Sequence, residues 1–388
     1  VLLRIDGMER DQRILLQDND LTDVLGMDLD ANNIEQVATA TQDGSSFSIN
    51  LIRSLAGQDT GRVNPVPSTA IEDGDDETEG LMLMGDLNDD GFDDFVVSTP
   101  EADLVSMTDN GRVAVYYGSS SGLSELPDMI YAGASDGAQF GFGMDLGDFN
   151  NDGVLDLAVG SPGWAPANDP TTRHGMVHVY LGNASGVSAT PWSNLTGVAN
   201  ESLGSAVAAL HHANSGDGLA ATARNHTVQV SPSQVDDGKV NLYTGNESGL
   251  HPMRNLTQTE NGGLFGRSLE ACDVNNDGFD ELIVGNTGTY DAPATYSSVE
   301  YFFGSTSGYN GTADHTVASI TQGRLFGLNI ACVGDLNGDG FDEHIVSEPF
   351  NSTQSFGAGT LWLFEGTDGA LPGDADWQYF PPPNSRIG

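Results

Sequence analysis

Lysine and cysteine are scarce in this chain. Lys239 is the single lysine, and 13 basic residues stand against 56 acidic ones, which gives a formal net charge of −43 over 388 residues. A surface this acidic repels nucleic acid and anionic membranes, so we expect neither as a partner. The two cysteines, Cys272 and Cys332, could form one disulfide in an oxidising compartment or remain two buried thiols.

Membrane-spanning runs and catalytic motifs are also missing. Nothing resembles a signal peptide or a transmembrane segment, so we expect no direct membrane insertion of this segment. The first residue is Val1 rather than Met, which indicates processing or trimming. The eight histidines are scattered, and no nucleophile elbow, metalloprotease helix or phosphate-binding loop is present. We therefore predict that the chain is not an enzyme, although an acidic chain can hold a carboxylate pair for glycoside chemistry.

What the chain has in abundance is glycine and one recurring acidic loop. Residues 148–156 (DFNNDGVLD) place oxygen side chains at positions 1, 3, 5 and 9, a backbone carbonyl at position 7 and a Gly at position 6. This oxygen-rich shell is what Ca²⁺ prefers. The same pattern begins at Asp86, Asp273 and Asp335, so we predict about four structural Ca²⁺ sites. Their expected ligands are Asp86, Asn88, Asp90, Phe92, Asp94, Asp148, Asn150, Asp152, Val154, Asp156, Asp273, Asn275, Asp277, Phe279, Glu281, Asp335, Asn337, Asp339, Phe341 and Glu343.

Two degraded copies complete a regular series. Asp28, Asp30 and Asn32 form a weak metal candidate, because the loop lacks the Gly. The copy at His211 has lost its carboxylates at positions 1, 3 and 5, so we predict no metal there. The loops begin at 28, 86, 148, 211, 273 and 335, and a period of about 60 residues signals a propeller or array.

Each unit reads as a four-stranded antiparallel meander. In the third unit the expected strands are residues 142–146, 157–159, 175–182 and 192–196, which we name A to D. The second is a short, nearly continuous apolar run suited to burial on both faces. Repeating such units radially limits exposed sheet edges, so the predicted fold is an all-β propeller forming a single domain over residues 1–380. A Pro-rich exit segment follows at 381–388.

Three marks make the repeats resemble FG-GAP repeats, those of the integrin α-subunit propeller. They are Phe-Gly before strand A (residues 140–141, 265–266 and 326–327), the acidic loop, and a Gly-x-Pro-like end to strand B (160–162, with 98–100 and 347–349 similar). The resemblance implies structural Ca²⁺ in the loops and ligand or subunit binding on the opposite face. It also implies a seven-bladed ring if the chain was trimmed. The visible repeats give six full units plus an N-terminal C–D hairpin from residues 1–5 and 13–17.

The opposite face carries the long connections between strands B and C and between strands D and A. Loops on a rigid scaffold commonly carry function, and the residue types found here are enriched at binding hot spots. The ligand-face candidates are Trp164, Arg173, His174, Tyr290 and Tyr296.

Eight Asn-x-Ser/Thr sequons point to export. The glycosylation candidates are Asn183, Asn194, Asn200, Asn225, Asn246, Asn255, Asn310 and Asn351. Several fall on C–D turns and outer strands, which would coat the outer rim with sugar.

The sequence therefore predicts an extracellular, calcium-stabilised binding or adhesion module on a cell or virion surface. Its expected partner is a protein or glycan ligand on the loop face, with other surface-protein subunits also possible. The alternatives are a structural subunit of a surface layer, filament or virion and, with less support, a carbohydrate-active enzyme. Scarce lysine and abundant Asp resemble the proteins of halophilic archaea, whose salt screens self-repulsion; an acidic secreted protein from a marine or calcium-rich setting is the other source that fits.

Overall fold

The computed structural model describes the side chains of most of the chain beyond residue 80. The described residues are 81–104, 107–120, 122–124, 126–212, 216–225, 238–257, 264–287, 297–319, 325–349, 359–368, 375 and 377–379. For the strands before residue 81, and for 227–228 and 235–236, only backbone pairing is described.

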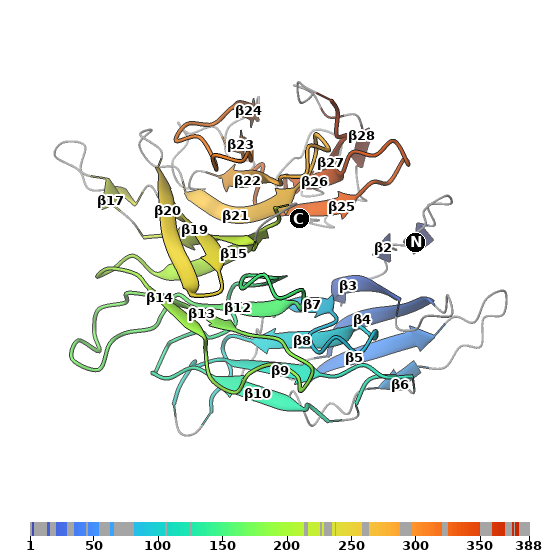
Figure 1. Ribbon diagram of the computed structural model, residues 1–388, viewed down its shortest axis with the longest axis vertical. Helices are drawn as coiled ribbons and strands as arrows, with labels where there is room; N and C mark the ends of the chain where they lie inside the picture. Colours follow the sequence, from blue (N-terminus) through green and yellow to red (C-terminus); the bar gives the residue numbers. More distant parts are fainter. Residues whose placement is uncertain are drawn as a thin grey trace. The chain divides into compact units, whose positions relative to one another are not determined.

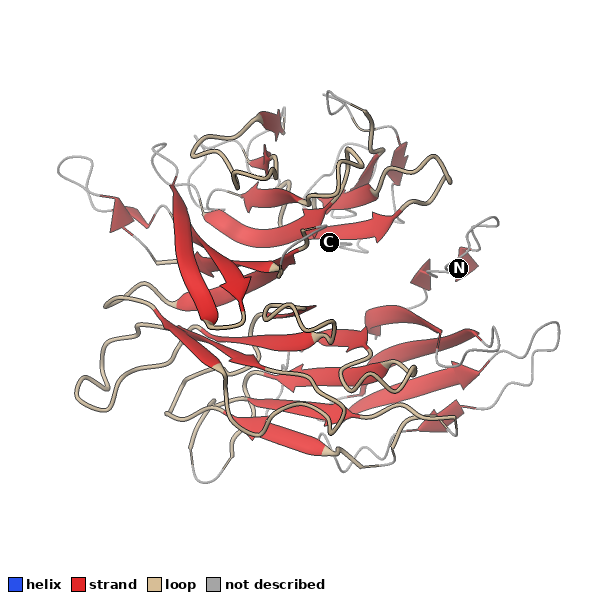
Figure 2. Cartoon of the chain, viewed as in Figure 1, coloured by secondary structure: helices blue, strands red, loops and turns tan. Residues whose placement is uncertain are grey.

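Four-stranded antiparallel meanders build the molecule, and the described residues contain no helix (Figures 1 and 2). Among the residues described with side chains, one blade consists of β7 (Met82–Gly85), β8 (Asp94–Thr99), β9 (Arg112–Tyr116) and β10 (Met129–Ala132), and the next of β11 (Met144–Gly147), β12 (Asp156–Ser161), β13 (Met176–Tyr180) and β14 (Ser193–Thr196). The third consists of β15 (Leu203–Leu210), β16 (Gly218–Ala223), β19 (Lys239–Asn246) and β20 (Gly249–Thr257). The last two consist of β21 (Phe265–Cys272), β22 (Glu281–Asn286), β23 (Ser298–Phe302) and β24 (His315–Ala318), and of β25 (Ile330–Gly334), β26 (Glu343–Ser347), β27 (Leu361–Phe364) and β28 (Trp377–Tyr379).

The predicted meander of β-propeller blades is confirmed, but the predicted number of blades is not. The residues described with side chains form five blades, where the sequence predicted six plus a hairpin, or seven. N-terminal to them, only backbone pairing is described: β1 (Leu2–Leu3) pairs with β2 (Ile14–Leu15), and β3 (Leu21–Asp28), β4 (Glu35–Asp43), β5 (Ser46–Arg53) and β6 (Val63–Pro65) pair in order. The loop spacing counts repeat units along the chain, and the unit that contains Asp28 lies in the part described by backbone pairing alone.

The chain divides into two compact units. One comprises residues 1–148 and 152–196, and the other comprises 149–151 and 197–388. In the first unit β7 lies beside β3 and β11, and in the second β21 lies beside β15 and β25. The single domain over residues 1–380 stays a prediction, and residues 381–388 lie outside the described part of the chain.

Burial of strand B and packing between blades hold each unit together. Every residue of β8, β12 and β16 is buried, as their apolar runs predict for a strand covered on both faces. In the first unit one core cluster joins β8 and β9 to β12 and β13 through residues such as Val96, Val115 and Leu157. In the second unit two clusters join successive blades in the same way.

A further two-stranded hairpin, β17 (Thr227–Val228) and β18 (Val235–Asp236), lies in the connection from β16 to β19.

Candidate functional site: four acidic loops

The four acidic loops occupy the same place in four blades. Each connects strand A to strand B, and in each case position 9 is the first residue of strand B: Asp94, Asp156, Glu281 and Glu343. The remaining blade carries the degenerate loop between β15 and β16. Loops at equivalent positions of the sequence repeat therefore lie at equivalent positions of their blades, between strand A and strand B.

The loops share one backbone conformation. Positions 4 and 6 have positive φ in every copy, for example 57° at Asp89 and 84° at Gly91. A side chain with a Cβ is strained there, and Gly, Asn and Asp tolerate it best. Position 4 accordingly holds Asp89, Asn151, Asn276 and Gly338, and position 6 is always Gly.

The position 1 carboxylate organises each loop by accepting backbone N–H groups. In the first copy Asp86 accepts the amides of Asp90 at 3.2 Å and Gly91 at 2.8 Å. The corresponding bonds recur at Asp148, Asp273 and Asp335, at 2.8–3.1 Å. The position 5 carboxylate accepts the amide of position 7 at 3.0 Å in all four copies. A carboxylate has about four acceptor sites, so these bonds leave capacity for a cation.

The position 9 carboxyls are buried. Asp94, Asp156 and Glu281 have no exposed surface, and Glu343 retains 1%. Asp94 accepts the amides of Leu87 at 3.0 Å and Gly118 at 2.8 Å. Burial, reinforced by the neighbouring Asp90 and Asp86, raises the pKa of Asp94 to about 7, and burial near Asp277 and Asp273 raises that of Glu281 to about 8. Burial also raises the pKa of Glu343.

These features fit a hard divalent cation. A buried carboxyl that is surrounded by other carboxylates favours a positive charge beside it, and oxygen donors at positions 1, 3, 5, 7 and 9 match Ca²⁺. The loop carboxylates do not form a compact set of three. Among the described residues, the one set of three His, Cys, Asp or Glu donors lying within 4.8 Å of one another is Cys272, Cys332 and Asp342, where the two sulfurs are bonded together. A bound cation would have to draw the carboxylates of a loop closer.

The degenerate loop replaces carboxylates by a histidine pair. His211 Nδ1 lies 2.8 Å from Asp217 Oδ2, and the His211 amide donates to Asp280 at 2.7 Å. The His212 ring contacts Phe279 edge-on. This loop therefore contacts the neighbouring acidic loop through Asp280 and Phe279. The absence of a metal ion from the degenerate loop stays a prediction. The weak candidate at Asp28, Asp30 and Asn32 lies outside the residues whose side chains are described.

Three of the five ligand-face candidates lie in one described loop, residues 162–175. Trp164 and His174 are half-buried with edge-to-face rings 6.4 Å apart, and Arg173 is exposed. The amide of His174 donates to the carbonyl of Trp164 at 3.0 Å, which closes the loop onto itself. Trp164 therefore packs within its loop and keeps one part exposed. Tyr290 and Tyr296 lie outside the described residues, so they are not placed beside it.

Every sequon Asn that the structure describes is exposed. Those residues are Asn183, Asn194, Asn200, Asn225, Asn246, Asn255 and Asn310. Asn351 lies outside the described part of the chain. Exposure meets the steric requirement for glycosylation, and modification itself stays a prediction.

The two cysteines are joined in the structure. A disulfide links Cys272 of β21 to Cys332 of β25, so the two innermost strands of adjacent blades are covalently connected. Sequence reasoning missed the buried ion pair between Lys239, at the start of β19, and Glu201, just before β15 of the same blade. The sequence holds no local signal for this pair, because its two residues lie 38 positions apart.

Comparison with known proteins agrees with the loop geometry. A sequence profile of the FG-GAP repeat matches residues 82–116, 140–180, 265–299 and 328–364, each within one blade. Phosphatidylinositol-glycan-specific phospholipase D of Mus musculus is 37% identical over 117 residues, covering 29% of this chain and 14% of that protein. Integrin alpha-3 of Cricetulus griseus is 28% identical over 146 residues, covering 37% of this chain and 13% of that protein.

A rhamnogalacturonan lyase structure from Bacillus licheniformis aligns over 94% of this chain and 77% of its own, with 11% identity and a TM-score of 0.38, which is too low to support any argument. The chain spans only about a seventh of the curated relatives it matches. Four of its blades match the FG-GAP repeat, and these matches, together with the similarity to integrin alpha-3, support a β-propeller of the FG-GAP and integrin α type.

Proposed function

We propose that this chain is a calcium-stabilised binding module that works outside the cell and has no catalytic activity of its own. The observation that carries the proposal is the fourfold recurrence of one loop, with the same backbone conformation, the same hydrogen bonds and a buried carboxyl at position 9. The similarity to a phospholipase covers 14% of that enzyme, so it supports a shared repeat rather than a shared reaction.

In each loop the side chains at positions 1, 3, 5 and 9 and the carbonyl at position 7 would hold Ca²⁺. When bound, the ion supplies positive charge that offsets the mutual repulsion of the loop carboxylates. Position 1 already holds the turn through amide bonds, and position 9 ties the loop to the start of strand B. The ion would therefore secure the A–B hairpin at one end of the blade.

Three observations support an extracellular location. The Cys272–Cys332 bond belongs to an oxidising compartment. All described sequon asparagines are exposed. Integrin alpha-3 and integrin alpha-PS2 of Drosophila melanogaster are among the relatives. No helix in the described residues is long and apolar enough to cross a membrane. The charge of −43 further favours a setting in which salt or divalent cations screen the surface, such as that of a halophilic archaeon.

The binding surface that we propose is the end of the blades opposite the calcium loops. In the first unit that end includes the loop of residues 162–175, held against the connection that follows β10 by the amide of Gly163 donating to Ala138 O at 3.1 Å. The exposed Arg173 and the half-buried Trp164 offer a charged and an aromatic contact on a fixed backbone. A protein or glycan ligand fits this combination, and attachment to a cell or particle surface is the role that follows.

Calcium titration tests the stabilising role. Isothermal titration at fixed high salt should find about four sites, and melting temperatures should rise with Ca²⁺ and fall with chelator. At a free concentration of 100 times Kd, one site adds about 2.7 kcal/mol to the free energy of unfolding. Asp86→Asn should remove one site, whereas Asp89→Asn, at the non-ligating position 4 of the same loop, should remove none. Identical melting with calcium and with chelator would contradict the proposal.

A panel of defined glycans and purified matrix proteins on an array tests the binding role. Arg173→Ala should reduce the signal of any ligand bound at the proposed face. The matched control is Arg254→Ala, which removes an exposed arginine from the outer strand β20. Equal losses in the two variants would show that charge alone, rather than this face, holds the ligand.

A further inference from the structure

We propose that the Cys272–Cys332 disulfide positions the last two calcium loops as a pair, so that its redox state sets their affinity for Ca²⁺. The inference rests on the proposed calcium binding and adds a regulator to it. Cys272 directly precedes Asp273, which is position 1 of one loop, and Cys332 lies three residues before Asp335, position 1 of the next. One covalent bond therefore ends at the base of both loops.

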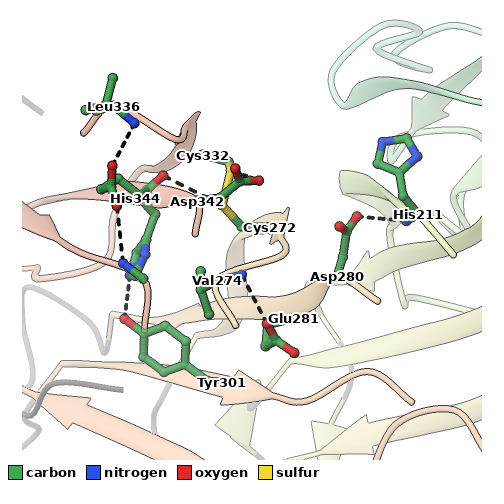
Figure 3. The surroundings of a disulfide bond; sticks show 12 residues. His211, Cys272, Val274, Asp280, Glu281, Tyr301, Cys332, Leu336, Asp342 and His344 are labelled. Carbon is green, nitrogen blue, oxygen red and sulfur yellow. Dashed lines mark hydrogen bonds between the residues drawn. A yellow bond between two sulfur atoms is a disulfide. The ribbon is translucent and has the colours of Figure 1, made fainter. Parts of the chain in front are cut away.

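The sulfur atoms also contact the far end of the second loop. Cys272 Sγ lies 3.7 Å from the backbone oxygen of Glu343, the position 9 residue. Cys332 Sγ lies 3.9 Å from Asp342 Oδ2, one residue earlier. Figure 3 shows the bond between Cys272 and Cys332, with the side chain of Asp342 beside it. The disulfide thus adjoins the entry of one loop and the exit of the other.

Backbone hydrogen bonds extend this connection. The amide of Asp342 donates to Asp273 O at 3.3 Å, and the amide of Thr367 donates to Val274 O at 2.8 Å. Val274 in turn donates its own amide to Glu281, the position 9 carboxyl of the first loop, at 3.2 Å. A shift of β25 relative to β21 would therefore be transmitted to ligands of both loops.

The other two loops provide an internal comparison. The residues equivalent to Cys272 are Gly85 and Gly147, and those equivalent to Cys332 are Leu83 and Asp145, so no cysteine lies at the base of the loops at Asp86 and Asp148. Those loops have the same amide bonds at positions 1 and 5 as the paired loops. Any effect of the disulfide on metal affinity should therefore appear in two loops out of four.

The physical reason is preorganisation. Before metal binds, the clustered carboxylates of the two loops repel one another, and separation of β21 from β25 would relieve that repulsion. The disulfide prevents this separation of the two strands. The loops therefore lose less conformational freedom when Ca²⁺ binds, and the free-energy cost of ordering them is smaller. On reduction, one dithiothreitol transfers two electrons and two protons to the S–S bond, which gives two cysteine thiols and the cyclic disulfide of the reagent.

The experiment is calcium titration of the folded protein before and after reduction, with thiols counted in each sample and the fold checked by circular dichroism. Outer-loop variants in which Asp86→Asn and Asp148→Asn are combined isolate the paired loops. In these variants reduction should weaken the remaining sites by roughly 10-fold or more, the usual scale for groups that orient metal ligands. In the reciprocal variant, Asp273→Asn with Asp335→Asn, reduction should leave affinity unchanged.

Each outcome is decisive. Unchanged affinity in the paired loops after verified reduction would overturn this inference and leave the proposed calcium binding intact. Absence of calcium binding in both redox states would overturn the proposed calcium binding itself. Equal weakening in all four loops would also overturn the inference, because the effect would then be a general loosening of the chain. The combined variant Cys272→Ser with Cys332→Ser should reproduce the reduced state without a reductant.

Discussion

Replacement of Lys239 by methionine should destabilise the second unit strongly. The ammonium group of Lys239 contacts Glu201 Oε1, and the two side chains retain only 12% and 6% of their exposure. Glu201 Oε2 accepts the amide of Val198 at 3.1 Å. Lys239→Met keeps the length of the side chain but removes the positive charge that this buried carboxylate contacts. Such a loss costs about 3–5 kcal/mol.

The assay is reversible denaturation of the single and double variants. For a unit spanning residues 197–388, each 1 kcal/mol shifts the melting temperature by roughly 2–4 °C, so Lys239→Met should lower it by roughly 6–20 °C. Adding Glu201→Gln removes the buried charge while the amide oxygen still accepts the Val198 N–H. The double variant should therefore recover most of the loss.

Two results would refute this reasoning. A loss of less than about 1 kcal/mol in Lys239→Met would mean that the pair is solvated and behaves as a surface ion pair. A double variant as unstable as the single one would mean that the lysine contributes by packing rather than by charge. Measurement at low and high salt adds a check, because a buried pair responds weakly to screening.

Three further predictions concern other blades. Reduction of the Cys272–Cys332 bond, which closes a segment of 60 residues, should lower the free energy of unfolding by about 4 kcal/mol on the chain-entropy estimate, measured by denaturation with and without reductant. Gly111→Ala should cost about 1–3 kcal/mol, because φ is 81° and a Cβ would meet the backbone of Phe140 at 2.4 Å; Gly122→Ala, with a φ of 98° and nothing within 4 Å, should cost less in the same melts. Burial lowers the pKa of His178, so the unfolded chain gains a proton near pH 6.5 before the native chain does, and stability should fall as pH falls through that value; the change between pH 8 and pH 5 should be smaller in His178→Gln.

The four-stranded repeat was predictable from the sequence because it depends on local patterns. Short apolar runs such as 157–159 are buried strands, and the acidic loops precede them at a constant spacing. Positive φ at Gly153 and Asn151 follows from residue type, since few other residues adopt it without strain. The FG-GAP assignment was reached from the same marks, because each of them lies within a single blade.

The structure alone decided what depends on contacts between side chains that local patterns do not relate. The sequence left Cys272 and Cys332 open between a disulfide and two thiols, and only the approach of β21 to β25 brings their sulfurs together. No local pattern in the sequence predicts that Lys239 is buried against Glu201, which lies 38 residues away. Trp164 was equally ambiguous until its ring was placed against His174. Local periodicity determines strands and loops, whereas pairing across long separations depends on how strands and blades pack in three dimensions, and no short window of sequence contains that information.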